Sequence, residues 1–412
     1  MRVPWAKRAG MSELSRLERD LMERIDPAVM LDQVMAWSAI NTGTRNLSGL
    51  ARQADLLATA FAALPGDVAL HAGDPVEAVT AGGCSVAIDH GRHLVLRVRP
   101  CANRRFLLTG HMDTVFPPDH PFQTARWLDD DTVNGPGVAD MKGGIAVILA
   151  ALTAFEASPH AAGVGYDVLI NADEETGSLS SAPLIARLAQ GKTAAFTFEP
   201  SARPDGTLAG ARPGSGNYSV VIHGKSAHAG RNPEDGRNAI VAAASLVLAL
   251  TALSGPDISI NPAKIEGGSA NNVVPDLAVV RFNIRPRETG AATRFATALP
   301  AAIARIEAAH GVRMHVHGGI SRPPKPLSEG AERLFHLVRD CGTALGQTIG
   351  WQATGGVCDG NNIAACGVPV VDTMGVRGGA IHSDQEFLIV PSLAERARLA
   401  TLVLHRLSGD QP

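Results

Sequence analysis

The stretch that most constrains the fold of this chain is residues 106–115, where an apolar run is followed at once by a histidine and an aspartate. The apolar run predicts a buried strand of a parallel sheet, and Gly110 predicts a sharp turn of the backbone directly after it. His111 and Asp113 would then lie at the carboxyl end of that strand, where open α/β sheets bind their ligands. A histidine supported by a carboxylate can bind a metal ion, although a purely structural histidine would give the same pattern.

Two further strand-like runs end in carboxylates. Residues 168–172 lead, after one aspartate, to Glu174 and Glu175, and residues 194–198 lead to Glu199. Adjacent carboxylates repel one another unless water or a cation neutralises them. A solvated acidic turn would explain the pattern, but the position directly after buried strands favours a metal, with one carboxylate free to move a proton.

Two glycine-rich segments add an aspartate and a second histidine. Asp140 closes the segment 134–140 and precedes an apolar, alanine-rich helix predicted over residues 145–155. An ordinary helix cap would explain Asp140 equally well. The segment lacks the Gly-x-x-x-x-Gly-Lys-Ser/Thr spacing of a phosphate loop. His382 follows the glycine pair 378–379 in a similar way.

The composition favours small-molecule chemistry. The 412 residues allow two or three domains, and 45% apolar with 19% charged residues predicts a substantial core. A net charge of −3 provides no basic surface for nucleic acid or an anionic membrane. The five cysteines lack Cys-x-x-Cys spacing, which predicts reduced thiols; Cys358 lies in a glycine-rich turn but has no evident activating base. We see neither a signal peptide nor an apolar run of about 18 residues, and we expect a cytoplasmic protein.

Residues 215–319 have a pattern of their own. Strand-like and helix-like segments follow one another in the order β-α-β-β-α-β, at residues 217–223, 238–253, 258–266, 277–285, 291–310 and 312–316. That order is typical of a ferredoxin-like α+β domain. Proline-containing segments at 212–214 and 321–324 bound this region, and all of the metal candidates lie outside it. We therefore predict an α/β domain built from residues 1–212 and 322–412, with an insert of residues 213–321.

Apolar residues at helix spacing mark both ends of the chain. The spacing predicts helical structure over residues 13–40, a helix over 47–64 and a closing helix over 393–407. We expect the first ten residues to be a disordered lead or an artefact of the start site.

The assembled pattern resembles the active site of the M20 metallopeptidase family. It matches that family in order, type and spacing at His111-x-Asp113, Asp140, Glu174-Glu175, Glu199 and His382, and the resemblance extends over residues 13–408. The family includes acetylornithine deacetylase, succinyl-diaminopimelate desuccinylase and glutamate carboxypeptidases of the G2 type. The resemblance implies an α/β, zinc-peptidase-like catalytic domain with a mixed, largely parallel sheet, and an inserted ferredoxin-like lid and dimerisation domain of βαββαβ order.

The same resemblance implies two zinc ions per chain, although cobalt or manganese also suits such nitrogen and oxygen ligands. It implies that His111 and Glu199 bind one ion, that Glu175 and His382 bind the other, and that Asp140 bridges both.

Further roles follow from the same resemblance. It implies that Asp113 orients His111, that Glu174 is the general base, and that the peptide bond between Asp140 and Met141 is cis. A pair of metal ions acidifies a water molecule and polarises the scissile carbonyl. Glu174 would take the proton of that water and give it to the departing amine.

Within the insert, the segment 224–230 resembles the family segment whose histidine reaches into the active site of a second subunit. His228 would then complete the site of a partner, and the homodimer would form through the inserted domain. Asn272 and Arg285 match positions that bind the carboxylate of the substrate, a task that suits the planar fork of arginine. An exposed turn histidine and a solvated arginine at a strand end are the alternatives.

The loop with Gly355, Gly356 and Asp359 resembles the glutamate carboxypeptidase branch, and we expect it to bind substrate. The chain departs from the family at Asn283, where an aspartate is usual, and at Cys358, where a serine is common. Both positions lie outside the metal set, so the departures affect the choice of substrate rather than the class of reaction.

We therefore expect a zinc-dependent hydrolase that cleaves an amide next to an amino acid with a free carboxylate, as glutamate carboxypeptidase-like enzymes do. Its partner would be a small amino-acid amide. An N-acyl-amino-acid deacylase like acetylornithine deacetylase breaks the same type of bond and is the alternative. A non-catalytic metal-binding or amino-acid-binding protein on the same fold is a third possibility, but such a protein would have no use for the proton acceptor Glu174.

Overall fold

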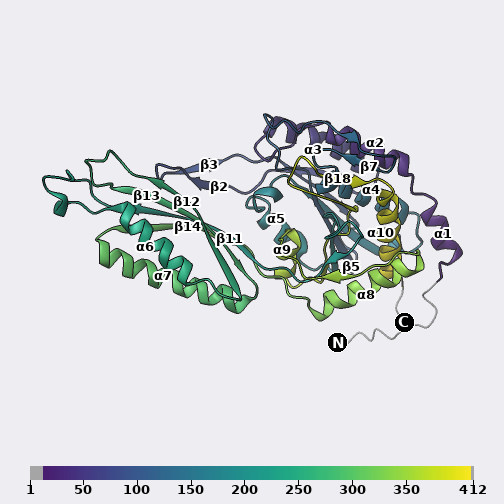
Figure 1. Ribbon diagram of the computed structural model, residues 1–412. Helices are drawn as coiled ribbons and strands as arrows, with labels where there is room; N and C mark the ends of the chain where they lie inside the picture. Colours follow the sequence, from purple (N-terminus) through teal and green to yellow (C-terminus); the bar gives the residue numbers. More distant parts are fainter. Residues whose placement is uncertain (1–12, 410–412) are drawn as a thin grey trace.

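The computed structural model describes residues 13–409 and has two parts of different shape. A rounded α/β part contains both described ends of the chain, and an elongated part extends from it (Figure 1). The chain enters the elongated part at Ser215 and leaves it at Arg322. The predicted domain boundaries lie close to these residues and remain a proposal. The expectation for the first ten residues lies outside the described part of the chain.

A six-stranded sheet forms the centre of the α/β part. Its strands, in spatial order, are β1 (Asp67–His71), β4 (His93–Val98), β8 (Val164–Asn171), β5 (Arg104–His111), β9 (Ala194–Thr197) and β16 (Val370–Val371). The last four run parallel to one another, whereas β1 and β4 pair antiparallel. Every residue of β8 is buried, as in a sheet covered on both faces, which explains the continuous apolar runs in the sequence. The mixed, largely parallel sheet is as predicted.

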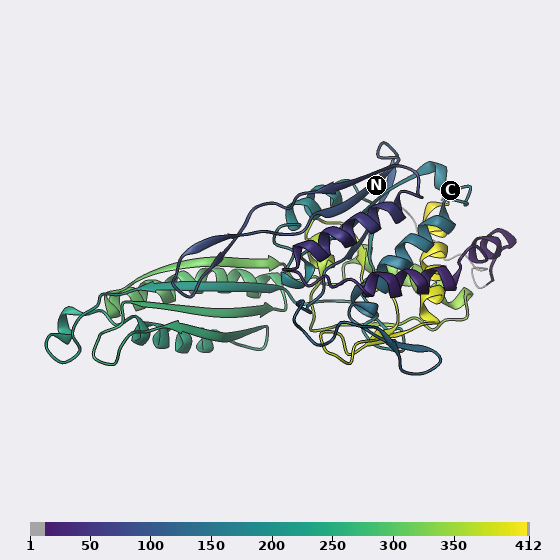
Figure 2. The ribbon, with the colours of Figure 1, turned by 90° about the horizontal axis from the view of Figure 1, so that it is seen from above.

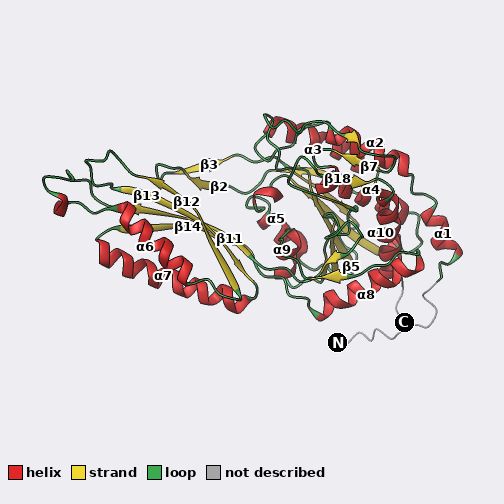
Figure 3. Cartoon of the chain, in the orientation of Figure 1, coloured by secondary structure: helices red, strands yellow, loops and turns green. Residues whose placement is uncertain are grey.

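Helices cover both faces of this sheet (Figure 3). The larger core joins one face to α1 (Arg16–Met22), α2 (Pro27–Ser38), α3 (Leu47–Phe61), α4 (Gly144–Phe155), α8 (Glu329–Ala344) and α10 (Ser392–Ser408). The other face packs against α5 (Ala182–Ala189) and α9 (Asp359–Ala365). Contrary to the expectation that no apolar run reaches about 18 residues, the window Val138–Phe155 is long and apolar enough to cross a membrane. It belongs to the core, because 89% of it is buried inside the protein.

The helical stretch predicted over residues 13–40 is two helices. Asp26 caps α2, accepting a hydrogen bond from Ala28 N at 2.9 Å, and Pro27 occupies the first helical position. Proline is favoured there because its missing N–H would have no helical partner. The cap and the proline together start a new helix inside an otherwise continuous apolar pattern.

The inserted part contains the elements in the predicted order. They are β11 (Ser215–His223), α6 (Ala239–Ala252), β12 (Ile258–Gly267), β13 (Leu277–Pro286), α7 (Thr289–His310) and β14 (Arg313–Arg322). The strands form an antiparallel sheet in the order β12-β13-β11-β14, and α6 and α7 pack on one face of it (Figure 1). The last strand is longer than predicted, because it continues to Arg322 at the junction with the α/β part.

The opposite face of the inserted sheet is contacted by a hairpin from the α/β part. Its strands are β2 (Val76–Val79) and β3 (Ser85–Ile88), which reach along the inserted sheet in Figure 2. Val79 packs against Val221 and Val279, and its carbonyl oxygen accepts a hydrogen bond from Arg281 at 2.7 Å.

Short strands fasten the remaining loops. A four-stranded sheet contains β6 (Arg126–Trp127), β7 (Thr132–Asn134), β17 (Gly378–Gly379) and β18 (Phe387–Ile389). A smaller pair contains β10 (Leu208–Ala209) and β15 (Trp351–Gln352). The pairing of β7 with β18 places the segment before Asp140 beside the segment that contains His382.

Candidate metal centre

Two groups of potential metal ligands lie at the carboxyl edge of the central sheet. His111, Asp140 and Glu199 form one group, and Asp140, Glu175 and His382 form the other; within each group the ligand atoms lie within 4.8 Å of one another. The structure therefore brings together all five residues for which the sequence predicted metal binding. Their roles as ligands remain a prediction.

Asp140 belongs to both groups and offers one carboxylate oxygen to each. Its Oδ1 lies 3.1 Å from Nε2 of His111, and its Oδ2 lies 3.3 Å from Nε2 of His382. Glu199 Oε2 lies 3.6 Å from the first imidazole nitrogen, and Glu175 Oε2 lies 3.1 Å from the second. Asp140 could therefore serve both ligand groups at once, and these side chains would hold a pair of metal ions.

Most of the ligand candidates lie at the ends of strands, as the sequence predicted. His111 is the last residue of β5, Glu174 and Glu175 follow β8, and Glu199 follows β9. The expected turn at Gly110 is wrong, because β5 continues through His111. Gly110 instead makes room for Met141: an added Cβ would lie 2.8 Å from Cε of that residue.

Asp140 lies just before α4, in an irregular turn over Val138–Gly143. The peptide bond between Asp140 and Met141 is cis, as the resemblance implied. His382 has a φ of +63°, a conformation uncommon for residues other than glycine.

The charges of these candidate ligands fit a divalent metal ion. Burial and the charge of Asp140 raise the pKa of Glu175 to about 8, and burial raises the pKa of Glu199. Hydrogen bonds to Asp140 and Glu175 raise the pKa of His382 to about 11. These carboxylates therefore need positive charge nearby, and imidazole nitrogens with carboxylate oxygens are ligands that catalytic zinc uses.

Asp113 supports both the histidine and the acidic turn. Its fully buried carboxylate accepts hydrogen bonds from the backbone N–H groups of Glu174 and Glu175, each at 3.2 Å, and from the hydroxyl of Thr44 at 2.8 Å. The Nδ1 atom of His111 lies 3.0 Å from the carbonyl oxygen of Asp113 and 3.4 Å from its Oδ1. Asp113 thus touches the ring that it was expected to orient, mainly through its backbone.

Glu174 has a partner that the sequence analysis missed. Nη2 of Arg322, at the end of β14, lies 2.7 Å from Oε1 of Glu174 and donates to its carbonyl oxygen at 2.9 Å. Burial raises the pKa of Glu174 to about 7, while the charge of Arg322 opposes this shift. The residue predicted to be the general base is therefore held from the junction with the inserted part. The only signal in the sequence was an arginine beside two prolines, which we used solely to mark a boundary.

Asp359, predicted to bind substrate, is buried and engaged with protein groups. Its carboxylate accepts hydrogen bonds from Ser178 Oγ and, at 2.7 Å, from Asn171 Nδ2, and it lies 3.5 Å from Nη2 of Arg322. A direct contact with substrate remains a prediction. The neighbouring Gly355 and Gly356 are exposed in the loop before α9.

The substrate-binding candidates of the insert lie at opposite ends of its sheet. His228 and Asn272 are exposed in neighbouring loops at the end far from the α/β part, where Ala229 N donates to the carbonyl oxygen of Asn272 at 2.9 Å. Arg285 lies at the end near the α/β part, directly after Ile284, which pairs with Gly216 of β11. The Nε atom of Arg285 donates a hydrogen bond to Oδ1 of Asn283 at 3.0 Å. Within one chain the structure does not bring His228 and Asn272 to the metal ligands.

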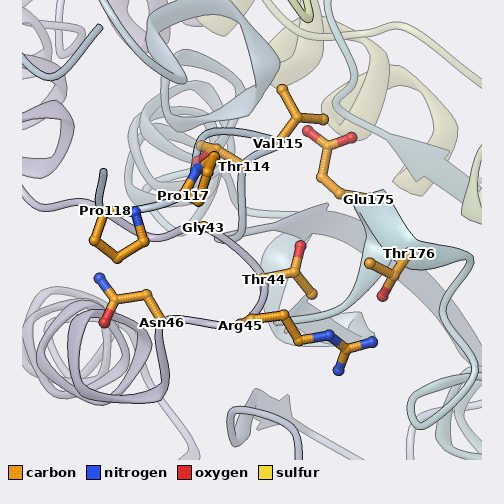
Figure 4. Close-up of a pocket in the computed structure, with 10 residues that line it drawn as sticks. All are labelled: Gly43, Thr44, Arg45, Asn46, Thr114, Val115, Pro117, Pro118, Glu175 and Thr176. Atoms are coloured by element: carbon orange, nitrogen blue, oxygen red, sulfur yellow. The ribbon is translucent and has the colours of Figure 1, made fainter. Parts of the chain in front are cut away.

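A cavity of about 290 Å³ opens beside Glu175 (Figure 4). It is lined by Gly43, Thr44, Arg45, Asn46, Thr114, Val115, Pro117, Pro118, Glu175 and Thr176. The cavity lies next to the second ligand group, because Glu175 belongs to both its wall and that group. Sequence reasoning missed it, because its walls come from loops without a motif.

The thiol of Cys358 has a structural partner. It is buried and accepts a hydrogen bond from Gly360 N at 3.3 Å at the start of α9. Burial raises the pKa of this thiol, which opposes formation of a thiolate nucleophile.

Comparison with known proteins identifies relatives of this chain. The sequence model of peptidase family M20/M25/M40 matches residues 107–406. The chain is 29% identical over 326 residues to carboxypeptidase G2 of Pseudomonas sp. (strain RS-16), covering 78% of each protein. It is also 29% identical over 320 residues to succinyl-diaminopimelate desuccinylase of Xanthomonas oryzae pv. oryzae (strain PXO99A), covering 73% of this chain and 83% of the relative.

Solved structures show the same fold. A tripeptidase from Staphylococcus aureus subsp. aureus Mu50 matches with a TM-score of 0.71 and 23% identity, covering 93% of this chain and 99% of that one.

Proposed function

We propose, from the premise that this chain belongs to peptidase family M20/M25/M40, that it cleaves an amide bond next to an amino acid with a free carboxylate, using two zinc ions. Family membership makes the chain a metallohydrolase of peptide or amide bonds. The observation that carries the two-metal part of the proposal is the sharing of Asp140 between two ligand groups. A binding protein for a single metal ion would have no need of this shared carboxylate.

The residues of the chain divide the chemistry among them. When bound, the metal pair would supply a polarised scissile carbonyl and a more acidic water. Glu174 belongs to neither ligand group, so its carboxylate stays free to accept a proton from the attacking water and to return it to the departing amine. Arg322 holds this carboxylate in place through a contact of 2.7 Å.

Arg285 would bind the carboxylate of the substrate. It lies at the end of the inserted sheet nearest the metal ligands, and burial together with the neighbouring charge of Arg322 lowers its pKa. An anion placed between two guanidinium groups would relieve their repulsion. Asn283, which departs from the family pattern, still accepts a hydrogen bond from Arg285 and helps to orient it.

We further propose a homodimer in which His228 donates a hydrogen bond to the oxyanion of the reaction in the site of the second chain. Its exposure, and its position at the far end of the inserted sheet, support this role. A cytoplasmic location and a lack of nucleic-acid or membrane partners remain predictions.

The test is release of free amine from N-acyl-glutamates, other N-acyl amino acids and dipeptides by the zinc-loaded protein. The likeness to both a carboxypeptidase and a desuccinylase leaves an N-acyl-amino-acid deacylase as the alternative. Preference for acyl-glutamates would support the first function, and preference for other acylated amino acids would support the second. No release from any substrate, with both metals bound, would contradict both.

A further inference from the structure

The buried carboxylate of Glu386 accepts hydrogen bonds from the backbone around Asp140. Glu386 belongs to neither ligand group. Oε1 of Glu386 accepts hydrogen bonds from the N–H groups of Ala139 and Asp140, each at 3.0 Å. Its Oε2 accepts from Gly137 N at 3.1 Å. Glu386 is 1% exposed, so this carboxylate is satisfied by three backbone donors of one short segment. Hydrogen bonds to a charged acceptor are the stronger kind, and three of them fix the path of the segment.

The backbone of this segment needs such a partner. Gly137 has a φ of +71°, and the dihedral angles of Asp140 and Met141 are not helical. The N–H groups of Gly137, Ala139 and Asp140 therefore converge on one point instead of following a helix axis. Concave arrangements of N–H groups bind anions, and here the anion is a side chain of the protein.

A second link runs in the opposite direction between the same two segments. Nδ2 of Asn134 donates to the carbonyl oxygens of Glu386, at 2.7 Å, and Asp384, at 3.0 Å. Glu386 follows His382 by only four residues, and Asn134 precedes Asp140 by six. The two segments that supply Asp140 and His382 are thus tied together by a side chain from each.

We propose that Glu386 is a positioning residue for the metal centre: it sets the place of Asp140 relative to His382 and thereby the affinity for both metal ions. It does not itself contact metal or substrate. This inference rests on the proposed metal centre but not on the proposed substrate. Groups that orient metal ligands typically change metal affinity by about 10–100-fold when they are removed.

The test is Glu386→Gln, which keeps the shape of the side chain but replaces one of the two acceptor oxygens by an NH₂ donor. Zinc affinity is measured on the folded variant by competition with a chromophoric chelator, well below its unfolding temperature. We expect an affinity about 10–100-fold weaker than that of the unaltered chain. Circular dichroism of the metal-free proteins shows whether the variant is folded.

Two companion variants keep the test decisive. Glu395→Gln is the matched control, because Glu395 pairs with Arg377 at 3.1 Å and belongs to neither ligand group. It should bind zinc like the unaltered chain. Asn134→Ala removes the reciprocal link while keeping Glu386, and should weaken zinc binding in the same direction but by less. It also tests the proposal if Glu386→Gln fails to fold.

The outcomes separate the possibilities. Unchanged zinc affinity in folded Glu386→Gln would overturn the proposal, and so would an equal loss in Glu395→Gln, which would indicate general destabilisation. If Glu386→Gln does not fold, unchanged affinity in Asn134→Ala overturns it. A chain that binds zinc but hydrolyses no amide would remove the proposed function and leave this test intact. A chain that binds no zinc would overturn both.

Discussion

Replacing Glu174 by glutamine should stop turnover without releasing metal. The carboxylate lies outside both ligand groups, so the change leaves all five ligand candidates in place. Arg322 Nη2 contacts Oε1 of Glu174 at 2.7 Å and its backbone carbonyl at 2.9 Å, and glutamine retains both oxygen acceptors. The variant side chain therefore stays where it is but cannot accept a proton.

The size of the effect follows from the role. A positioned general acid–base contributes about 10²–10⁴-fold to rate, which is about 2.7–5.5 kcal/mol of activation free energy. Two effects on stability oppose each other. Neutralising Glu174 removes its repulsion from Glu199 and Asp140, but it leaves Arg322 with Asp359, at 3.5 Å, as its remaining anionic partner. We therefore expect a folded protein with a large loss of kcat.

The assay combines kcat on the best substrate of the panel with metal content measured by atomic spectroscopy. Glu175→Gln is the matched control, since the neighbouring glutamate is expected to be a ligand and its loss should weaken metal binding. Turnover by Glu174→Gln at the rate of the unaltered chain, with both metals bound, would refute the reasoning. Loss of metal from Glu174→Gln but not from Glu175→Gln would refute it as well.

Three other perturbations test separate parts of the structure. His228→Ala should leave a dimer with a greatly reduced kcat, seen by light scattering and amine release; full activity as a monomer would remove the shared site. Asp372→Asn should lower the free energy of unfolding by about 3–5 kcal/mol, because Arg212 and Lys325 would lose a fully buried anionic partner. Although burial alone would raise it, Lys325 and Arg212 hold the pKa of Asp372 below its usual value. The stabilisation is therefore present above the ordinary aspartate pKa and fades as the pH falls below about 4, so denaturant curves of the two proteins should converge there. A chelator should abolish activity and lower the unfolding temperature, and zinc should restore both; an unchanged unfolding temperature would argue against bound metal.

The sequence predicted the parts of the site that depend on local order. His111, Glu174, Glu175 and Glu199 each follow a buried apolar run, and such runs become parallel strands whose carboxyl ends meet at one edge. The pattern therefore places these residues together before any distance is known. Asp140 could be assigned only through the family pattern, because a residue before a helix is equally well explained as a cap.

The contacts that hold the site could not be predicted in this way. Arg322 contacts Glu174, which lies 148 residues away in the sequence. Glu386 contacts Asp140, which lies 246 residues away. Periodicity indicates which face of an element is buried but not which distant side chain lies against it. The error at Gly110 has a similar cause, since only the packed structure shows that Met141 occupies the space beside it.

The geometry of the insert gives the strongest argument for a shared site. β11 has nine residues, so the inserted sheet carries its far end about 30 Å from the junction. The junction itself touches the catalytic machinery, because Arg322 at the end of β14 contacts Glu174. Rotation about the junction leaves the length of the sheet unchanged, and therefore no hinge angle brings His228 to the metal ligands of its own chain. Ala229 ties the loop of His228 to that of Asn272, so the two would enter a site together. A complete site would then combine Arg285 of one chain with His228 and Asn272 of another, and an isolated chain would bind metal yet lack a donor for the oxyanion.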